Sequence, residues 1–347
     1  MVAEQISKDA IFSVHPWNQS MLDWLRSQYQ KSTHAWLFCG QRGLGRRQVA
    51  LALAAELLSA DPRNRELLTA GTHPDLHVLM PEVQEQDDLL SVYANRYFNN
   101  QSTGKPKTVI TVDQVRELIQ KVSTRAHSAE HKVVIVTPAE FMNLNAANAL
   151  LKVLEEPPPA TFFILICERK NLVPATVRSR SSQVAFRTPN SDLAMSWLRE
   201  QLGARKDLEL LLSLANGAPL TALGYAQNKS NEDHLQIYED LKKLWQQGID
   251  PLALAARWHE LGVERVLPWL QRILCDLVLD AMGGGAGRSI HSEQMSWITD
   301  IIKILDITKS YYLYDKIGRA MIDLDGPLDK RLLLEDLALN FVTLKAA

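Results

Sequence analysis

A glycine loop near the start of the chain has the spacing of a phosphate-binding loop but lacks its functional groups. It reads GQRGLGRR from Gly40 to Arg47, with Gly43 and Gly45 inside it, and its glycines fit the pattern G-x-x-x-x-G-K-[ST]. In that pattern the lysine reaches the β- and γ-phosphates and the hydroxyl holds Mg²⁺. Here Arg46 replaces the lysine and Arg47 the hydroxyl residue, and a guanidinium cannot ligate a metal. The sequence therefore predicts a vestigial loop with no bound cofactor.

A second requirement for ATP hydrolysis is missing after the apolar run at 133–136. ATPases of this type place an aspartate there to support Mg²⁺ and a glutamate to polarise water. Thr137 and Pro138 occupy these two positions. The nearest carboxylate is Glu140, which we expect on a solvated turn. Loss of both groups argues against self-sufficient catalysis.

One arginine could act on a phosphate held by another molecule. Arg180 lies in TVRSRSS, residues 176–182, immediately before a predicted strand. An arginine supplied in trans can accelerate phosphoryl transfer by ~10³–10⁵. A lone arginine before a strand is more often solvated or ion-paired at the surface. The residue type alone therefore leaves both roles open.

Strand and helix signals alternate through the first half of the chain, which predicts an α/β fold with a parallel sheet covered by helices on both faces. Asp113 is the expected N-cap of one of these helices. The expected strands are 34–40, 75–81, 132–136, 161–167 and 181–186, and the expected helices are 45–60, 112–122 and 145–156. The glycine loop then joins the first strand to a helix N-terminus, the usual anion site of such folds.

Strand signals end near residue 188. The expected helices after that point are 191–202, 206–215, 232–247, 251–261, 264–282, 293–309 and 328–343. Residues 227–233, QNKSNED, suggest a polar linker. We therefore expect an α/β domain at 1–187, a small helical domain at 188–230 and an all-helical domain at 231–347. The polar segment 82–108 is expected to be a surface insertion.

Composition points to a protein of the cytoplasm without a membrane segment. The net charge of −2 gives no global basic field that would attract nucleic acid. The odd number of cysteines, Cys39, Cys167 and Cys275, and their wide separation indicate reduced, buried thiols and no metal site. The N-terminus lacks the pattern of a signal peptide, and no apolar run is long enough to cross a membrane.

Several segments together resemble the clamp-loader AAA+ family of bacterial DNA polymerase III. The degenerate loop and the missing acidic pair match its delta-prime branch, and the resemblance covers nearly the whole chain. The segments are HPWN (15–18), HPDLHVLMPE (73–82), VDQVREL (112–118), NAANALLKVLEEPP (145–158), TVRSRS (176–181) and GPLDKRLLLEDLAL (326–339).

The resemblance implies a RecA-like AAA+ domain, a lid and an oligomerising helical collar. It also implies a non-hydrolysing subunit of a hetero-oligomer that loads the sliding clamp onto primer-template DNA. Its partners would be the ATP-binding gamma/tau subunits and delta. The family motif S-R-C corresponds to Ser179, Arg180 and Ser181, with serine in place of cysteine. Arg180 would then be the arginine finger that acts in trans, supported by Ser179.

Other family elements are absent. The sensor-1 polar residue would fall at Cys167 or Glu168, and the sensor-2 arginine at Leu220. Many family members carry a four-cysteine zinc module after the loop helix, but the corresponding segment 57–75 contains no cysteine. We therefore expect no zinc and an ordinary helix at 64–70.

Three alternatives stay open at the level of sequence. One is a P-loop ATPase with unusual ligands, in which Arg46, Arg47 and Glu140 bind nucleotide and Mg²⁺. Another is a nucleic-acid-binding module that uses Arg42, Arg46 and Arg47 as a phosphate cradle. A third is a scaffold with no part in catalysis.

Overall fold

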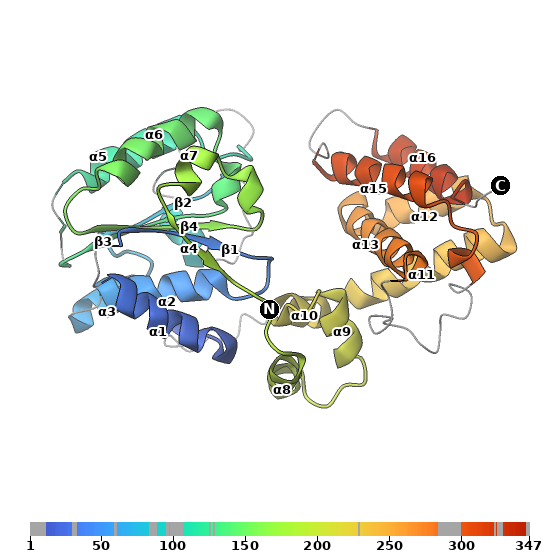
Figure 1. Cartoon of the computed structure of the whole chain (residues 1–347), viewed down its shortest axis with the longest axis horizontal. Coiled ribbons are helices and arrows are strands. Elements are labelled where there is room, and N and C mark those ends of the chain that lie inside the picture. Colours follow the sequence, from blue (N-terminus) through green and yellow to red (C-terminus); the bar gives the residue numbers. More distant parts are fainter. Residues whose placement is uncertain are drawn as a thin grey trace. The chain divides into compact units, whose positions relative to one another are not determined.

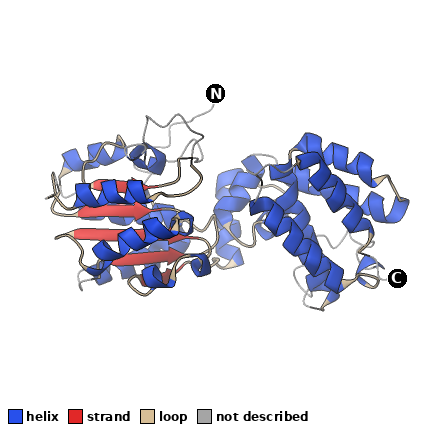
Figure 2. Cartoon of the chain, turned by 90° about the horizontal axis from the view of Figure 1, so that it is seen from above, coloured by secondary structure: helices blue, strands red, loops and turns tan. Residues whose placement is uncertain are grey.

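The chain forms two compact units, Met1–Leu193 and Ala194–Ala347. The computed structural model describes residues 12–29, 33–58, 61–82, 89–94, 97, 107–124, 126–127, 129–227, 230–283, 300–322, 324 and 329–344. Strands occur in the described part of the first unit, and the described part of the second unit is helical (Figure 2). The three-domain division stays a prediction. No helix in the described ranges is long and apolar enough to span a membrane.

A five-stranded parallel sheet forms the centre of the first unit. Its order is β2-β3-β4-β1-β5, so β1 lies between strands that follow it by more than a hundred residues. The strands are β1 (Ala35–Cys39), β2 (Leu76–Leu79), β3 (Lys132–Val136), β4 (Thr161–Cys167) and β5 (Ser182–Ala185). Each lies within or matches its predicted range, and the predicted α/β fold class is confirmed.

Helices cover both faces of this sheet, because alternate residues of each strand point to opposite sides. Leu37, Val134 and Phe163 form one core cluster with Leu118 and Leu150 of the helices above them. Figure 1 shows α5 (Val112–Val122), α6 (Leu144–Glu155) and α7 (Ala175–Arg178) on that side. On the other side lie α1 (Gln19–Tyr29), α2 (Arg46–Leu58) and α3 (Pro62–Thr69).

The N-cap of α5 is Thr111, and the prediction of Asp113 was wrong. The Thr111 side chain accepts a hydrogen bond from the backbone N–H of Gln114 at 3.5 Å, and the Gln114 side chain accepts one from the Thr111 N–H at 2.8 Å. This reciprocal capping box satisfies two donors of the first turn. Asp113 lies inside the helix, where its charge still suits the N-terminal end.

Part of the segment 82–108 is buried, contrary to the predicted surface insertion. Helix α4 (Leu89–Ala94) packs beside β2, and the side chains of Leu90, Tyr93 and Tyr97 are buried. The Tyr93 hydroxyl donates to the carbonyl oxygen of Leu68 at 2.9 Å. Leu90, Tyr93 and Tyr97 recur at helical spacing, but the polar residues around them hid this short pattern in the sequence. The remaining residues of the segment, apart from 82, 107 and 108, lie outside the described ranges.

The second unit consists of helices in its described part. They are α8 (Ser191–Leu202, which begins in the first unit), α9 (Leu208–Leu214), α10 (Pro219–Gln227), α11 (Ser230–Gln247), α12 (Pro251–Leu261), α13 (Val263–Ala281), α15 (Ile307–Ile322) and α16 (Lys330–Val342). The predicted ranges of α8 and α12 match the structure. Helix α10 was missed because Pro219 was interpreted as a break, whereas proline is favoured at the first helical position.

Two other predictions for this unit were wrong in part. The linker predicted at 227–233 is largely helical, since α10 extends to Gln227 and α11 begins at Ser230. The single helix predicted at 293–309 is interrupted between residues 303 and 306, and α15 begins at Ile307. Asp306 accepts a hydrogen bond from the backbone N–H of Lys309 at 3.0 Å, which stabilises the new helix start. Residues 293–299 lie outside the described ranges.

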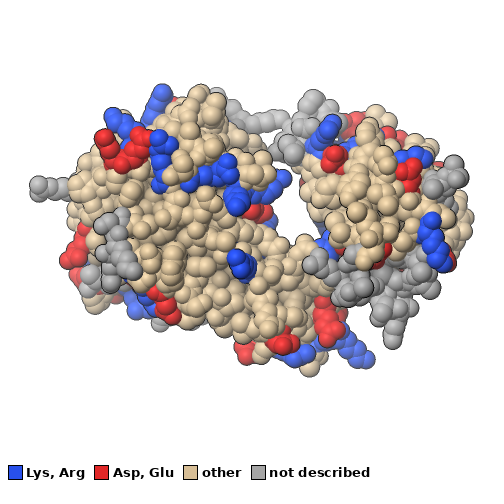
Figure 3. Space-filling model, in the orientation of Figure 1, with Lys and Arg blue, Asp and Glu red and all other residues tan. Residues whose placement is uncertain are grey.

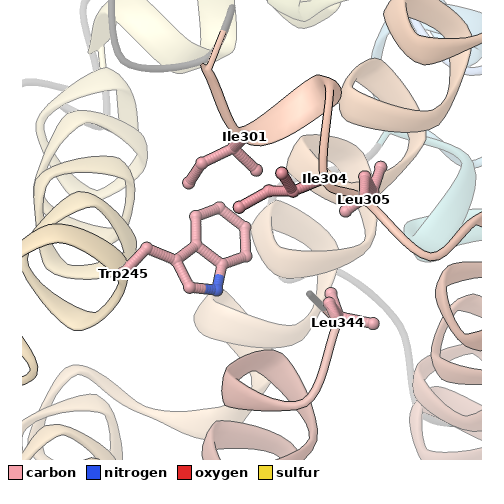
Figure 4. A pocket seen from close by; sticks show the side chains of 5 residues that line it. All are labelled: Trp245, Ile301, Ile304, Leu305 and Leu344. Atoms are coloured by element: carbon pink, nitrogen blue, oxygen red, sulfur yellow. The ribbon is translucent and has the colours of Figure 1, made fainter. Parts of the chain in front are cut away.

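The core of the second unit joins residues from α11 to α16. Trp245, Ile301, Ile304, Leu305 and Leu344 line a small apolar hollow at its margin (Figure 4). The only polar group among these side chains, the Trp245 indole N–H, donates to the carbonyl oxygen of Phe341 at 2.8 Å. The hollow is therefore a packing feature without chemistry of its own.

Candidate functional site

The carboxyl ends of the parallel strands bring the predicted loop and the predicted acidic positions to one edge of the sheet. The glycine loop follows β1, Thr137 and Pro138 follow β3, and Glu168 follows β4. A hydrogen bond of 3.3 Å from the Gly40 N–H to the carbonyl oxygen of Cys167 joins the first and last of these segments. Ligands of open α/β sheets bind at this edge. The vestigial glycine loop therefore lies where a phosphate-binding loop of this fold is expected.

Arg46, at the position of the lysine, is turned into the protein. Its side chain is only 8% exposed. Nη1 donates to the carbonyl oxygen of Cys167, and Nη2 lies 3.5 Å from the carboxylate of Glu168. Burial lowers the pKa of this guanidinium, and the Glu168 charge opposes that shift. The charge of Arg46 is thus directed to the end of β4. Arg47 lies half-buried in the first turn of α2.

Two of the loop glycines are required by packing. Gly40 lies against β5, where an added Cβ would come within 2.6 Å of the backbone oxygen of Phe186. Gly45 has φ of +86°, and a Cβ there would lie 2.7 Å from Nδ2 of Asn18. Gly43 also has a positive φ, of 82°. The spacing of a phosphate-binding loop can therefore persist for steric reasons after its functional groups are lost.

The segment before α1 covers the loop. Trp17 and Asn18 both donate to the carbonyl oxygen of Leu44, from Nε1 at 3.0 Å and from Nδ2 at 2.7 Å. The rings of His15 and Trp17 stack with centroids 4.7 Å apart. Side chains of the HPWN segment thus contact the loop directly. This contact was not predicted, because 26 residues separate Asn18 from Leu44.

Glu140 does not lie on a solvated turn as predicted. It is half-buried in the short helix η4 (Ala139–Phe141), and its Oε1 accepts hydrogen bonds from the backbone N–H groups of Glu168 at 2.8 Å and Arg169 at 3.3 Å. Hydrogen bonds from backbone N–H groups to a carboxylate are stronger than those to a neutral acceptor. Glu140 thus ties the end of β3 to the segment after β4.

Cys39 and Cys167 are far apart in the sequence but are neighbours in the fold. The prediction of buried thiols was wrong for Cys39 and Cys275, which are half-buried. Cys39 and Cys167 are register partners on β1 and β4, and their sulfur atoms lie 3.4 Å apart. A hydrogen bond from the Cys167 thiol lowers the pKa of Cys39, with help from the charges of Lys170 and Arg46. The same interaction, together with burial, raises the pKa of Cys167 far above its usual value. Cys39 and Cys167 stand near the ends of two predicted strands, which was the signal available in the sequence. The sequence did not indicate that these two strands pair.

Arg180 follows α7 and is partly exposed, with 34% of its side chain accessible. Nε and Nη2 both contact Glu155 at the end of α6. Nη1 donates to the carbonyl oxygen of Thr176 at 3.0 Å and to the Ser179 hydroxyl at 3.3 Å. The partners of the predicted finger therefore lie on α6 and around α7. The Glu155 contact was not anticipated from the sequence.

The serines beside Arg180 stabilise the chain around it. The Ser179 hydroxyl donates to the carbonyl oxygen of Thr176 at 3.0 Å, and the Ser181 hydroxyl donates to that of Val177 at 3.0 Å. Each hydroxyl shares its carbonyl acceptor with a donor of Arg180, which is Nη1 at Thr176 and the backbone N–H at Val177. Ser181 therefore has a structural contact at the position where the motif has cysteine.

Comparison with known proteins gives matches over both units. Residues 17–190 match the family described as "DNA polymerase III, delta subunit", and residues 228–343 match "DNA polymerase III, delta subunit, C terminal". DNA polymerase III subunit delta' of Pseudomonas aeruginosa is 34% identical over 320 residues, 89% of this chain and 87% of that protein. The protein of the same name from Escherichia coli is 32% identical over 274 residues, 76% of this chain and 75% of that protein.

This chain belongs to the family of DNA polymerase III delta' subunits. The resemblance to that family is therefore confirmed. The matched ranges contain most of the segments that suggested it, from HPDLHVLMPE at 73–82 to GPLDKRLLLEDLAL at 326–339. They also contain the altered loop and the stretch around Arg180.

The segment 57–75, in which we expect an ordinary helix and no zinc, contains a helix in its described part. Helix α3 occupies the middle of that segment, capped by the Asp61 side chain, with Asn64 and Leu68 buried. It begins two residues before the predicted range 64–70 and ends at Thr69. No cysteine is present in the segment, so these residues do not fit a thiolate-bound zinc ion.

Proposed function

We propose that this chain is a clamp-loader subunit of DNA polymerase III that does not hydrolyse ATP itself and supplies Arg180 in trans to the ATP site of a neighbouring subunit. It works as an accessory subunit of the polymerase holoenzyme. The observation that carries the proposal is a contrast between two arginines. Arg46 in the chain's own loop is buried against Cys167 and Glu168, whereas Arg180 is partly exposed at the end of α7.

The state of the loop supports the first half of the proposal. Hydrolysis needs a compact cation on the phosphates, a Mg²⁺ ligand and a carboxylate that orients water. Arg46 is engaged by its own chain, and Thr137 and Pro138 carry no carboxylate. Glu140, required by the alternative of an ATPase with unusual ligands, accepts two backbone hydrogen bonds instead. These contacts disfavour that alternative, and the chain is proposed to need neither ATP nor zinc as its own cofactor.

The chemistry of arginine supports the second half. A guanidinium cannot be deprotonated in proteins and presents its donors in a plane that matches phosphate oxygens. A finger acts where charge develops on the transferred phosphoryl group, so it must be presented at a surface that another subunit reaches. Arg180 meets that requirement because a third of its side chain is accessible. Ser179 supports it through the contact at 3.3 Å.

The partners in this proposal are the ATP-binding gamma/tau subunits, the delta subunit and, through them, the sliding clamp and primed DNA. The helices of the second unit would form the collar that joins the assembly. Direct DNA binding by a cradle of Arg42, Arg46 and Arg47 is disfavoured, because Arg46 is buried. On the face shown in Figure 3, Asp and Glu side chains lie among the Lys and Arg side chains, so this face is not uniformly basic.

The test is the ATPase rate of the reconstituted clamp loader with wild-type chain or the Arg180→Ala variant, in the presence of clamp and primed DNA. The expected result is an intact assembly whose turnover falls by ~10³-fold or more. The isolated chain is the blank and is expected to show no turnover. Unchanged turnover in the variant assembly would reduce the role of the chain to that of a scaffold.

A further inference from the structure

A carboxylate on a different helix holds the guanidinium of Arg180. Glu155 is the last residue of α6 and lies 25 positions before Arg180 in the sequence. It contacts both Nε and Nη2, which share one edge of the guanidinium plane. Both N–H groups meet the same oxygen, Oε1, while Nη1 is held separately by the carbonyl oxygen of Thr176, so contacts on two sides restrain the orientation of the plane as well as its position.

The place of Glu155 is itself well defined by local structure. The N–H of Glu156 closes the helix by donating to the carbonyl oxygen of Lys152 at 3.0 Å. Pro157 and the two prolines after it prevent the helix from continuing. The carboxylate therefore lies at a helix end whose position is set by the sequence, and α6 packs beside α7, the short helix that Arg180 follows.

The remaining contacts of Arg180 leave part of the guanidinium for another acceptor. Nη1 is engaged by Thr176 and Ser179. A guanidinium has five N–H donors, and these four contacts use at most four of them. At least one N–H, on Nη2, therefore has no acceptor among the described residues. Since the side chain is also partly exposed, a phosphate oxygen of a neighbouring subunit could take that donor.

Holding a long side chain in one orientation reduces what must be ordered when the neighbour binds ATP. An arginine has many rotamers, and a group ordered in advance does not lose that freedom during the reaction. The carboxylate does not touch the phosphate in this arrangement. It acts through the arginine.

We infer that Glu155 is a positioning residue that orients Arg180 toward the ATP of the neighbouring subunit, an inference that rests on the function proposed above. The pair spans two elements, α6 and the segment after α7, so its geometry depends on how these elements pack. Glu155 matters for the rate of ATP turnover in the assembly and not for the affinity of the neighbour for ATP.

The experiment compares four versions of the chain in the reconstituted clamp loader with clamp and primed DNA: wild type, Glu155→Gln, Arg180→Ala and the double variant. Glutamine keeps the size of the side chain and removes its charge. The expected result for Glu155→Gln is a fall in kcat of about tenfold with unchanged KM for ATP. In the Arg180→Ala background the same substitution is expected to have no further effect, because its partner is absent.

Glu156→Gln is the matched control, since Glu156 is adjacent and exposed but makes no side-chain contact found in the described structure. It is expected to behave as wild type. Assembly of each variant is verified by size-exclusion chromatography, and Glu155→Asp, which retains the charge, is expected to recover part of the lost rate.

The outcomes separate the inference from the function on which it rests. If Arg180→Ala lowers turnover and Glu155→Gln does not, the finger stands and the role of Glu155 is refuted. An equal loss from Glu155→Gln with and without Arg180 would also refute it, because Glu155 would then act independently. A rise in turnover with Glu155→Gln would refute the inference as well, because Glu155 would then hold Arg180 away from the phosphate. If Arg180→Ala has no effect, both proposals fail.

Discussion

The guanidinium of Arg46 and the main-chain carbonyl oxygen of Cys167 are hydrogen-bonded across the end of the sheet, with Nη1 as the donor. This single contact links the first residue of α2 to the last residue of β4, 121 positions later. It replaces an interaction with phosphate by one within the protein. The loop is thereby stabilised as part of the fold.

Restoring the loop residues is expected to leave the isolated chain without ATPase activity. In the variant Arg46→Lys with Arg47→Thr, the phosphate cation and the Mg²⁺ hydroxyl are back, but Thr137 and Pro138 still provide no carboxylate. The measurement is phosphate release from ATP by the purified variant with Mg²⁺. Turnover that depends on Mg²⁺ and is absent from wild type would show that another carboxylate replaces the missing pair.

Substituting Gly45 is expected to destabilise the first unit by more than the strain of a side chain at a positive φ. Gly45→Ala places a side chain on a backbone in the left-handed region and adds a Cβ only 2.7 Å from Nδ2 of Asn18. Gly203 also has a positive φ, but a Cβ there meets nothing within 4 Å, so Gly203→Ala measures the strain alone, about 1–2 kcal/mol. We expect Gly45→Ala to cost about 1 kcal/mol more.

The measurement is hydrogen–deuterium exchange in the elements around each substitution, which reports their local free energy of opening. If the contact with Asn18 is the cause, the extra cost of Gly45→Ala shrinks in an Asn18→Ala background. Equal free-energy costs at Gly45 and Gly203 would mean that the segment containing Asn18 moves away from the added Cβ without loss of stability.

The three thiols are expected to react with iodoacetamide in a fixed order as pH rises. The lowered pKa of Cys39 produces its thiolate, the reactive form, at a pH below the ordinary value of about 8.5. Burial raises the pKa of Cys275, and both burial and the hydrogen bond to Cys39 raise that of Cys167, so these thiols react later. Peptide mass spectrometry of alkylated protein over a pH series measures the order.

Cys167→Ala tests the cause of that order. Without the donated S–H, the pKa of Cys39 is expected to rise toward its usual value, so that alkylation of Cys39 at a given pH becomes slower. An unchanged pH profile would assign the reactivity of Cys39 to the nearby charges alone.

Asp240 is expected to be a stability determinant of the second unit. Its side chain is 1% exposed, forms an ion pair with Arg257 and accepts hydrogen bonds from Trp258 at 3.2 Å and Gln236 at 2.9 Å. Asp240→Ala leaves the buried Trp258 N–H without its acceptor and is expected to cost about 1–3 kcal/mol, because Arg257 is 47% exposed and water can solvate its charge. The control is Glu239→Ala, which removes an exposed pair with a 3.5 Å separation and is expected to cost less than about 1 kcal/mol.

Hydrogen–deuterium exchange in α11 and α12 measures the free energy of local opening for both substitutions. Asp240→Asn separates charge from hydrogen bonding, because asparagine keeps one acceptor oxygen. If Asp240→Ala costs no more than Glu239→Ala, the buried network contributes nothing to stability.

Local sequence signals were sufficient for most of the secondary structure and for the family. Strand β4 matches its predicted range of 161–167, and α12 matches 251–261, because apolar periodicity and proline positions act over a few residues. The failures are also local in cause. A proline that starts α10 was interpreted as a break, and buried tyrosines around α4 were hidden in a polar segment.

By itself, the sequence determined that the phosphate-binding loop lacks its lysine and hydroxyl, that the acidic pair is absent and that Arg180 is retained. Only the tertiary structure decided that Arg46 is bonded to Cys167, that Asn18 covers the loop and that Glu155 holds Arg180. For the first contact the physical reason is the strand order, which places β1 beside β4 and thereby joins residues more than a hundred positions apart. The other two contacts join residues 26 and 25 positions apart through the packing of neighbouring elements. Such long-range pairings arise from packing of the whole unit and leave no periodic trace in the chain.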